Sequence, residues 1–380
     1  MNQRINGSTL AKDSESKDEG HLLFNKLILG KLSRREHLSQ PEINKVIKNI
    51  INGDCSDIFT SAFLMGLQIK GETDDEFSGV IEAIRTASIN ITLDTQLPLV
   101  DNCGTGGDML NTFNISTAAA IIASSCNRVA IAKHGNRSSS GLSGSADMLE
   151  HIGYPLEHIQ PDRLSYLINQ NGFGFLFAPN YHPGLKHVSR IRRELGVQTV
   201  FNKIGPLCNP CTNLNAQVIG VSNPFLLSMI PKIIPILGLK RAMIIRSEEG
   251  MDELSTTGRN HIVHVISEDG DYKIHSEILE PSSLGIKPAS IRDLMVKNKM
   301  DAINESLRVI YGFCINKPKE DIVLLNSAAV LLAGNSVESM DEGLSIVRES
   351  VREGRPQKLL RNVINSIGDM GKLELAEKAL

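Results

Sequence analysis

The alternation of short apolar runs with helical segments after residue 92 most restricts how this chain can fold. The runs "LPLVDNCG", "NRVAIAKHG", "GFGFLFAPN", "AQVIGVSNP" and "RAMIIRSEEG" each predict a strand that leads into a glycine-rich or polar loop. Helical segments such as "PFLLSMIPKIIPIL" lie between them. Strands that alternate with helices predict an α/β fold with a mostly parallel central sheet. Ligands of such sheets bind at the carboxyl ends of the strands, so the loops there form the candidate site.

Residues 21–92 carry a different pattern, with apolar residues three or four positions apart in "INKVIKNIING" and "DIFTSAFLMGLQIKG". This spacing predicts helices. Ser39, followed by proline, predicts a helix start, and Gly53 and Gly71 predict helix ends. Four helices without a strand predict a small N-terminal helical domain ahead of the larger α/β domain. The segment 301–380 also has a helical pattern, and the length of 380 residues fits two or three domains.

Composition excludes several classes of protein. The polar residues 1–20 predict a disordered tail rather than a signal or transit peptide. No apolar run approaches the roughly 20 residues of a membrane span. A net charge of -3 argues against a general nucleic-acid surface. Cys208 and Cys211 form a lone CxxC without the second pair that a zinc site needs, so they are expected to be ordinary thiols of a cytoplasmic protein.

The loop "GTGGD", residues 104–108, suits an anion. Glycines let main-chain N–H groups face a ligand, and the helix that starts near "NIST" adds the positive end of its dipole. Ser116 and Thr117 supply hydroxyls for phosphate oxygens or a metal ion. The motif is neither GxGxxG nor GxxxxGK[ST], which weakens Rossmann and P-loop interpretations. The alternative interpretation is a glycine turn followed by a helix cap.

A second donor-rich loop, "KHGNRSSSGLSGSAD", follows the next predicted strand. Lys133 offers a point cation for a phosphoryl group, and the serines and glycines offer hydroxyl and N–H donors. His134 and Asn136 could equally be ordinary loop hydrogen-bonding residues. Two such loops, each after a strand and each opening a helix, favour a phosphate site.

Two adjacent carboxylates, Asp252 and Glu253, follow the predicted strand "AMIIR". Neighbouring acids are usually solvated, but beside phosphate loops they suit magnesium, which prefers one or two carboxylates plus phosphate oxygens. These features predict a substrate with more than one phosphate. In the basic segment 186–193, one arginine could bind a carboxylate by a bidentate fork, and the residues alone do not say which.

Nine ordered motifs, "GTGGD", "NIST", "KHGNR", "GSAD", "FLFAP", "HPG", "IRRELG", "FNKIGPLCNP" and "GMDELS", resemble those of the anthranilate phosphoribosyltransferase family, from about Leu22 to Leu380. The resemblance implies a fold of the nucleoside phosphorylase/phosphoribosyltransferase type. The helical domain would comprise 21–92 with a returning segment 183–210, and the α/β domain 93–182 and 211–380. It implies a homodimer through the helical domain, and no nucleic-acid or membrane partner.

The implied reaction transfers phosphoribosyl from phosphoribosyl pyrophosphate to the amine of anthranilate, with Mg²⁺ as two ions per subunit. The aromatic amine is nucleophilic without prior deprotonation, so no acid or base residue is assigned. The resemblance assigns phosphoribosyl pyrophosphate to Gly104, Gly107, Asp108, Thr112, Asn114, Ser116, Thr117, Lys133, Ser138, Ser139, Ser140, Gly141 and Ser145. It assigns anthranilate to Gly104, His134, Asn136, Tyr181, Arg192 and Pro206, and magnesium to Ser116, Asp252 and Glu253.

The sequence departs from the family motifs at one position, and two alternative functions remain open. Leu142 stands where many members carry Lys or Arg, which could weaken binding of phosphoribosyl pyrophosphate. A pyrimidine nucleoside phosphorylase-like enzyme would carry a different glycine-loop pattern. A non-catalytic nucleic-acid-binding relative would show a basic face and lack Asn136 and Arg192, both of which are present here.

Overall fold

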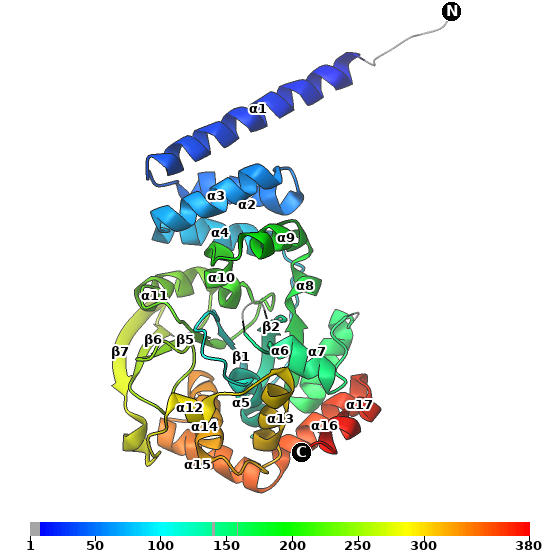
Figure 1. The fold of residues 1–380 in the computed structure, drawn as a ribbon, viewed down its shortest axis with the longest axis vertical. Coiled ribbons are helices and arrows are strands. Elements are labelled where there is room, and N and C mark those ends of the chain that lie inside the picture. Colours follow the sequence, from blue (N-terminus) through cyan, green and yellow to red (C-terminus); the bar gives the residue numbers. More distant parts are fainter. Residues whose placement is uncertain (1–7, 139–140, 158) are drawn as a thin grey trace, which may run out of the picture. The chain divides into compact units, whose positions relative to one another are not determined.

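The computed structural model describes residues 8–138, 141–157 and 159–380, and the chain divides into two compact units (Figure 1). The helical unit comprises Met1–Ala87 and Gly184–Val200, and the α/β unit comprises Ser88–Pro183 and Phe201–Leu380. The predicted limits at 92 and 182 lie near these boundaries, whereas the predicted end of the returning segment at 210 lies beyond Val200, and the residue-level limits stay a prediction.

The helical unit is built from helices that start and end where the sequence indicates. Its helices are α1 (Ser8–Ser33), α2 (Gln40–Asn52), α3 (Asp57–Lys70), α4 (Asp74–Ala87) and α9 (Lys186–Leu195). At the start of α2, Glu42 accepts the Ser39 N–H at 2.9 Å, which satisfies a donor that the helix leaves open. Gly53 ends α2 with φ 82°, a left-handed conformation that glycine adopts without strain. The helix α9 packs on α2 and α3.

The first helix is longer than the sequence analysis expects. Residues 8–20 are helical in the structure, in contrast to the predicted disordered tail. Residues 8–19 contain neither glycine nor proline. The C-terminal part of α1 buries Ile28 and Leu32, and once such a nucleus exists, each added helical residue costs little. Residues 1–7 of the predicted tail lie outside the described residues.

The α/β unit is organised around a seven-stranded sheet in the order β3-β2-β1-β4-β5-β6-β7. The strands are β1 (Leu99–Gly104), β2 (Ala130–Gly135), β3 (Phe173–Phe177), β4 (Ala216–Gly220), β5 (Arg241–Ser247), β6 (Asn260–Glu268) and β7 (Asp271–Leu279). The pairs among β1 to β5 are parallel. The predicted mostly parallel sheet is therefore confirmed, and its five parallel strands match the five apolar runs.

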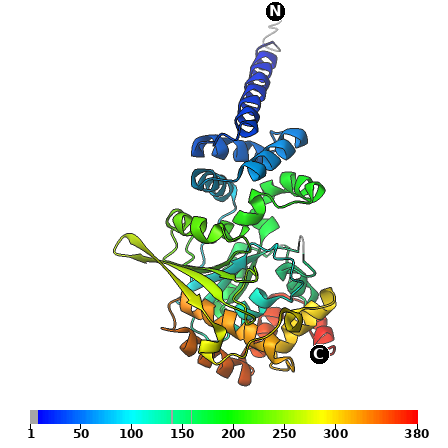
Figure 2. The same ribbon diagram turned by 60° about the vertical axis from the view of Figure 1, so that its left-hand side comes forward.

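The strands β6 and β7, which none of the apolar runs predicts, form an antiparallel hairpin at one edge of the sheet (Figure 2). Asp269 and Gly270 turn the chain with φ of 52° and 89°, the positive values that a tight hairpin turn requires. Most of β7 is solvent-exposed, so its sequence lacks the apolar signal of a buried strand.

Helices cover the sheet, and one of them forms the centre of the core. The helix α5 (Ile115–Ser124) buries Ala118, Ile121 and Ile122 completely. Around it pack α13 (Lys299–Ile310), α14 (Lys317–Ala333), α15 (Met340–Arg352) and α16 (Arg355–Ile367) (Figure 1).

The other helices are α6 (Ser145–His151), α7 (Pro161–Asn171), α8 (Ala178–Tyr181), α10 (Val200–Ile204), α11 (Leu226–Leu237), α12 (Ile291–Leu294) and α17 (Met370–Glu377). In the part of the chain that the structure describes, no helix combines the length and the apolarity needed to cross a membrane.

Candidate functional site

The glycine loop after β1 meets the acidic loop after β5. The Gly106 N–H donates a hydrogen bond to Asp252 Oδ2 at 2.6 Å. A Cβ at Gly104 would overlap Asp252 Oδ2, and a Cβ at Gly220 would overlap the Asp252 carbonyl oxygen. Gly107 has φ 82°, in the left-handed region that favours glycine. The glycines of β1 and β4 thus allow the main chain and the carboxylate of Asp252 to approach both strands without side chains between them.

Three carboxylates gather where these loops meet. Ligand atoms of Asp108, Asp252 and Glu253 all lie within 4.8 Å of one another. Burial raises the pKa of Asp252, and the charge of Asp108 raises it further. Burial, followed by the charges of Asp252 and Asp108, raises the pKa of Glu253 well above its usual range. A divalent cation would relieve this repulsion, and three carboxylate oxygens are the donor type that magnesium accepts.

Asp108 was assigned to phosphoribosyl pyrophosphate, and the structure places it with the two predicted metal ligands. Its position in sequence gave no sign of this proximity, because Asp252 lies more than a hundred residues further along the chain. Ser116, the third predicted metal ligand, lies in the first turn of α5.

The buried lysine of β2 connects to the start of α5. Lys133 is 2% exposed, and its Nζ donates to the Asn102 carbonyl at 2.6 Å and to Ser116 Oγ at 3.4 Å. Burial lowers the pKa of Lys133. Among the described residues, buried Asn114 Oδ1 and Thr117 Oγ1 have no hydrogen-bond partner. Buried polar atoms are normally paired, so these two are available to a bound polar molecule.

The serine-rich loop is clamped by one carboxylate. Asp147 Oδ2 accepts the Ser138 N–H at 3.0 Å and the Gly144 N–H at 2.9 Å, which ties both ends of the loop together. Lys299 of α13 donates to Asp147 Oδ1 at 2.7 Å. Within the loop, Ser138 Oγ donates to the Gly141 carbonyl at 2.7 Å. The predicted Ser139 and Ser140 lie outside the described residues.

Two buried histidines face each other in the α/β unit. The rings of His134 and His182 are arranged edge to face, with centroids 5.3 Å apart. Burial lowers the pKa of His134 well below its usual value and that of His182 to about 4, so both rings are neutral near pH 7. Neither Nε2 atom has a hydrogen-bond partner among the described residues. His182 is not among the residues that the sequence assigns to the site, because the "HP" turn gives no sign that its histidine is buried.

Other residues predicted to line the acceptor site lie on neighbouring elements of the α/β unit. Tyr181 ends α8 and is buried, which raises its pKa to about 12. Pro206 is buried in a short 3₁₀ turn, Gly205–Cys208, and its carbonyl accepts a hydrogen bond from Gln217 Nε2 at 2.6 Å. The Asn136 carbonyl accepts from Ser145 Oγ at 3.3 Å, so the main chain of Asn136 is tied to the first residue of α6.

Arg192 lies on α9 of the helical unit, where it is half-buried, and this burial lowers its pKa. Its neighbours on α9 differ, because Arg193 is exposed and Arg190 forms an ion pair with Asp57. The motif assigns Arg192 rather than Arg193 to the substrate, and Arg192 is also the less solvent-exposed of the two.

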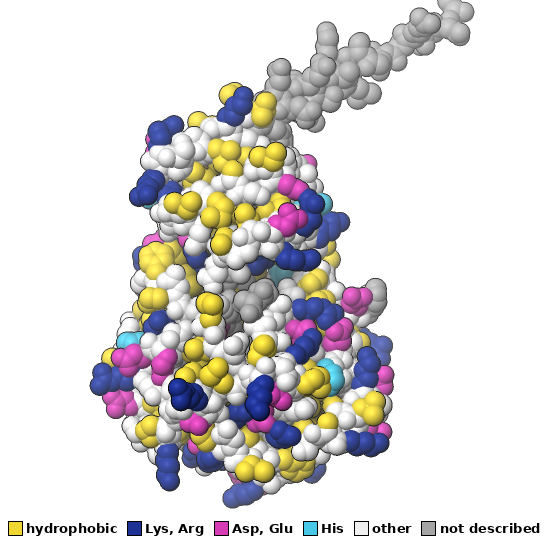
Figure 3. All heavy atoms as spheres, in the orientation of Figure 1, with side chains coloured by type: hydrophobic (Ala, Val, Ile, Leu, Met, Phe, Trp, Pro, Cys, Tyr) yellow, Lys and Arg dark blue, Asp and Glu magenta, His cyan; other side chains and the backbone are white. Residues whose placement is uncertain are grey.

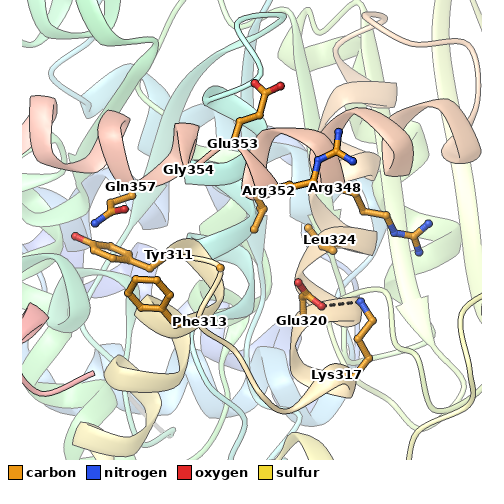
Figure 4. A pocket seen from close by; sticks show the side chains of 12 residues that line it. Tyr311, Phe313, Lys317, Glu320, Leu324, Arg348, Arg352, Glu353, Gly354 and Gln357 are labelled. Atoms are coloured by element: carbon orange, nitrogen blue, oxygen red, sulfur yellow. Dashed lines mark hydrogen bonds and ion pairs between the residues drawn. The ribbon is translucent and has the colours of Figure 1, made fainter.

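A separate groove of about 690 Å³ lies in the α/β unit, beside α14, α15 and the start of α16 (Figure 4). A Lys317–Glu320 ion pair of 2.6 Å lies within it. Tyr311, Phe313, Arg348 and Arg352 contribute to its lining. None of the described residues that the sequence assigns to the site lines this groove, so the groove is separate from the site.

Comparison with known proteins identifies relatives of both units. Residues 96–357 match the glycosyl transferase family a/b domain, and residues 26–88 match the helical bundle domain of the glycosyl transferase family. Anthranilate phosphoribosyltransferase of Nitrosopumilus maritimus is 35% identical over 347 residues, which cover 91% of this chain and 97% of that protein.

Solved structures show the same likeness. The Thermus thermophilus anthranilate phosphoribosyltransferase aligns with a TM-score of 0.80 and 34% identity over 90% of this chain and 99% of its own. The Saccharomyces cerevisiae enzyme in complex with PRPP and Mg aligns with a TM-score of 0.82 and 26% identity over 90% of this chain and 97% of its own.

Proposed function

Because the chain belongs to the anthranilate phosphoribosyltransferase family, we propose that it transfers the phosphoribosyl group of phosphoribosyl pyrophosphate to the amine of anthranilate. The products are N-(5-phosphoribosyl)anthranilate and pyrophosphate, in tryptophan biosynthesis, so the enzyme is a pentosyltransferase. The observation that carries the proposal is the meeting of the glycine loop with three carboxylates at the carboxyl ends of β1 and β5. Such a combination suits a polyphosphate with a divalent cation.

The phosphoribosyl pyrophosphate site would be formed by the loops after β1 and β2. Main-chain N–H groups of the glycine loop and the N-terminus of α5 would hold phosphate oxygens, with Lys133 as a buried cation near Ser116. The residues that we assign to this substrate are Gly104, Gly107, Asp108, Thr112, Asn114, Ser116, Thr117, Lys133, Ser138, Ser139, Ser140, Gly141 and Ser145.

The magnesium site would comprise Asp252, Glu253 and Ser116, and the position of Asp108 adds it to this set. We propose two ions per subunit. Bound magnesium would stabilise negative charge on the pyrophosphate leaving group.

The chain itself contributes mainly by binding and orientation. When the bond between C1 of the ribose and the pyrophosphate oxygen breaks, positive charge develops on the ribose and negative charge on the leaving group. Main-chain N–H groups of the glycine loop would donate to the phosphate end of the substrate. The Lys133 ammonium, which is fixed by its bond to the Asn102 carbonyl, would stabilise the leaving charge through its own positive charge, without reorganisation. The lone pair of the anthranilate amine attacks C1 as the pyrophosphate leaves, and the nitrogen then gives up one proton to the pyrophosphate or to water. Holding both substrates in place supplies much of the rest of the rate.

Anthranilate would be bound by its carboxylate and its ring. We assign Arg192 to the carboxylate, since a guanidinium fork matches carboxylate geometry. Asn136, Gly104 and the buried groups His134, Tyr181 and Pro206 would line the approach of the ring. Neutral His134 avoids placing a second cation there.

Exposed apolar side chains on the helical unit support a homodimer through this part of the chain. Figure 3 shows yellow side chains gathered over the helical unit. The most exposed are Leu22, Leu23, Leu27, Ile58 and Ile69, with exposed fractions between 51% and 84%. Burying such side chains against a second copy would remove apolar area from water. The proposal includes a cytoplasmic location, where the free thiols would stay reduced.

The test is the loss of anthranilate fluorescence on addition of phosphoribosyl pyrophosphate and magnesium. Turnover that depends on both additions, and that falls in a Glu253→Gln variant, is the expected result. Cleavage of a pyrimidine nucleoside by phosphate, with no consumption of anthranilate, would instead assign the chain to the nucleoside phosphorylases. No reaction with either substrate pair, together with binding of nucleic acid, would favour the non-catalytic alternative.

A further inference from the structure

Two adjacent polar residues are buried in the middle of β1. Asp101 is 0% exposed and Asn102 is 4% exposed. Side chains of successive strand residues point to opposite faces of a sheet, so Asp101 and Asn102 lie on opposite faces of the sheet. Asn102 Nδ2 donates to the Ser116 carbonyl at 2.7 Å, and Asn102 Oδ1 accepts from Lys133 Nζ at 3.2 Å. Asn102 therefore connects β1 to the phosphoribosyl half of the proposed site.

Asp101 connects β1 to three other segments. Its Oδ1 accepts the His134 N–H of β2 at 3.1 Å. Its Oδ2 accepts from Asn209 Nδ2 at 2.9 Å and from Gln217 Nε2 of β4 at 3.0 Å. All three partners are donors, which matches an ionised carboxylate because it offers acceptors only. Burial raises the pKa of Asp101, and these hydrogen bonds oppose that rise.

The side chains that bond to Asp101 also bond to the turn at Pro206, which we assign to anthranilate, and to the main chain nearby. Gln217 Nε2 also donates to the Pro206 carbonyl at 2.6 Å. Asn209 Nδ2 also donates to the Ala132 carbonyl at 2.9 Å, and Asn209 Oδ1 accepts the Cys211 N–H at 2.9 Å. The segment 205–211 is thus bonded to β2 through Asn209 and to β4 through Gln217, and Asp101 accepts a hydrogen bond from each of these two side chains.

We propose that Asp101 is a positioning residue for the acceptor half of the site, holding His134 and the turn at Pro206 in place, while Asn102 positions the phosphoribosyl half. The inference rests on the proposed function, because that function assigns His134 and Pro206 to anthranilate. Asp101 itself is not assigned to contact with either substrate.

The kinetic test compares two neighbouring variants. Asp101→Asn keeps the shape of the side chain but turns one acceptor into a donor, so at least one of the three partners loses its bond. We expect the KM for anthranilate to rise about tenfold, with the KM for phosphoribosyl pyrophosphate changed less than about twofold. Asn102→Ala is the matched control, and we expect the opposite pattern. An anthranilate KM that stays unchanged in Asp101→Asn would overturn the proposal.

A second readout needs no activity. Cys208 and Cys211 lie in the held segment and are 4% and 3% exposed, whereas Cys126, which follows α5, is 7% exposed. Alkylation by iodoacetamide, followed by mass spectrometry of each cysteine, reports local opening. In Asp101→Asn we expect Cys208 and Cys211 to react about tenfold faster and Cys126 to react at the wild-type rate. If all three react faster together, the effect is global and the proposed local role is wrong.

A milder variant covers the case in which Asp101→Asn fails to fold. Gln217→Met keeps the length of the side chain but removes the bonds to both Asp101 and Pro206. We expect the same selective alkylation and the same direction of change in KM. Wild-type protein that does not consume anthranilate would refute the proposed function, whereas unchanged labelling in both variants would refute the role of Asp101.

Discussion

The Gly106 N–H and Asp252 Oδ2 are hydrogen-bonded at 2.6 Å across 146 positions of sequence. This bond joins the loop after β1 to the loop after β5, and it forms in the protein alone. The loops that form the proposed site for the phosphates and the cation are therefore brought together by the fold. Preorganisation of this kind avoids the cost of assembling donors during the reaction.

Gly104→Ala tests whether this close approach matters. A Cβ at residue 104 would overlap Asp252 Oδ2, so the acidic loop must move. We expect activity to fall by about 100-fold and the free energy of unfolding by about 1–3 kcal/mol. A coupled fluorescence assay and urea unfolding measure the two effects. The control is Gly20→Ala, where an added Cβ meets nothing within 4 Å; equal activities of the two variants would contradict the role of the close approach.

The buried histidines predict a loss of stability in acid. The pKa of His182 is lowered from 6.5 to about 4, so between these pH values the unfolded chain binds more protons than the folded protein. Stability is therefore complete above the unfolded pKa and falls as the pH drops. For His182 the loss between pH 7 and pH 5 is about 2 kcal/mol.

The measurement is urea unfolding at both pH values for the wild type and His182→Gln. The variant should lose less stability on acidification than the wild type. Equal losses in the two proteins would show that His182 is not the group that titrates.

Arg192→Ala tests the proposed contact with the anthranilate carboxylate. A hydrogen bond between charged groups contributes about 1.5–3 kcal/mol, so we expect the KM for anthranilate to rise by about 10- to 100-fold. The KM for phosphoribosyl pyrophosphate should change little. Arg193→Ala, which removes an exposed arginine next to it, is the matched control and should resemble the wild type. Equal effects of both variants would indicate a general loss of charge instead.

Leu142→Lys tests the departure in the serine-rich loop. Leu142 is half-buried next to Gly141 and Ser143. An added cation should lower the KM for phosphoribosyl pyrophosphate by a few-fold, because it attracts phosphate across a short distance. Leu142→Gln controls for side-chain length and polarity. An unaltered constant in Leu142→Lys would reject the idea.

Ile58→Asp tests the proposed homodimer. Ile58 is 84% exposed on α3, so an aspartate there costs the folded chain little but opposes burial against a second copy. Sedimentation should show a dimer for the wild type and a much weaker one for the variant. Ile315→Asp places the same change at a 99% exposed position of the α/β unit and should not affect association. A monomeric wild type would contradict the proposal.

The parts of the fold that follow from local pattern could be predicted, and the parts that depend on distant contacts could not. The apolar runs around Val100, Ile131 and Ile244 become buried strands, as their composition indicates. The exposed strand β7 lacks such a run, and the helix at residues 8–20 continues from a nucleus in the following residues.

The site, too, could be predicted from the sequence only where local motifs form it. The loops of glycine, serine and lysine are evident from their motifs. The grouping of Asp108 with Asp252, and the contacts of Asp101 with residues 108 and 116 positions away, depend on how the sheet brings strands together. No local pattern encodes such contacts.

The hairpin of β6 and β7 has a consequence for the behaviour of the protein at high concentration. The strand order ends at β7, whose outer edge could in principle extend the sheet with a strand from another molecule. Exposed charged residues, among them Asp271, Lys273 and Glu277, recur along it. Such charges make the addition of a further strand unfavourable, so this edge is protected against self-assembly into larger sheets.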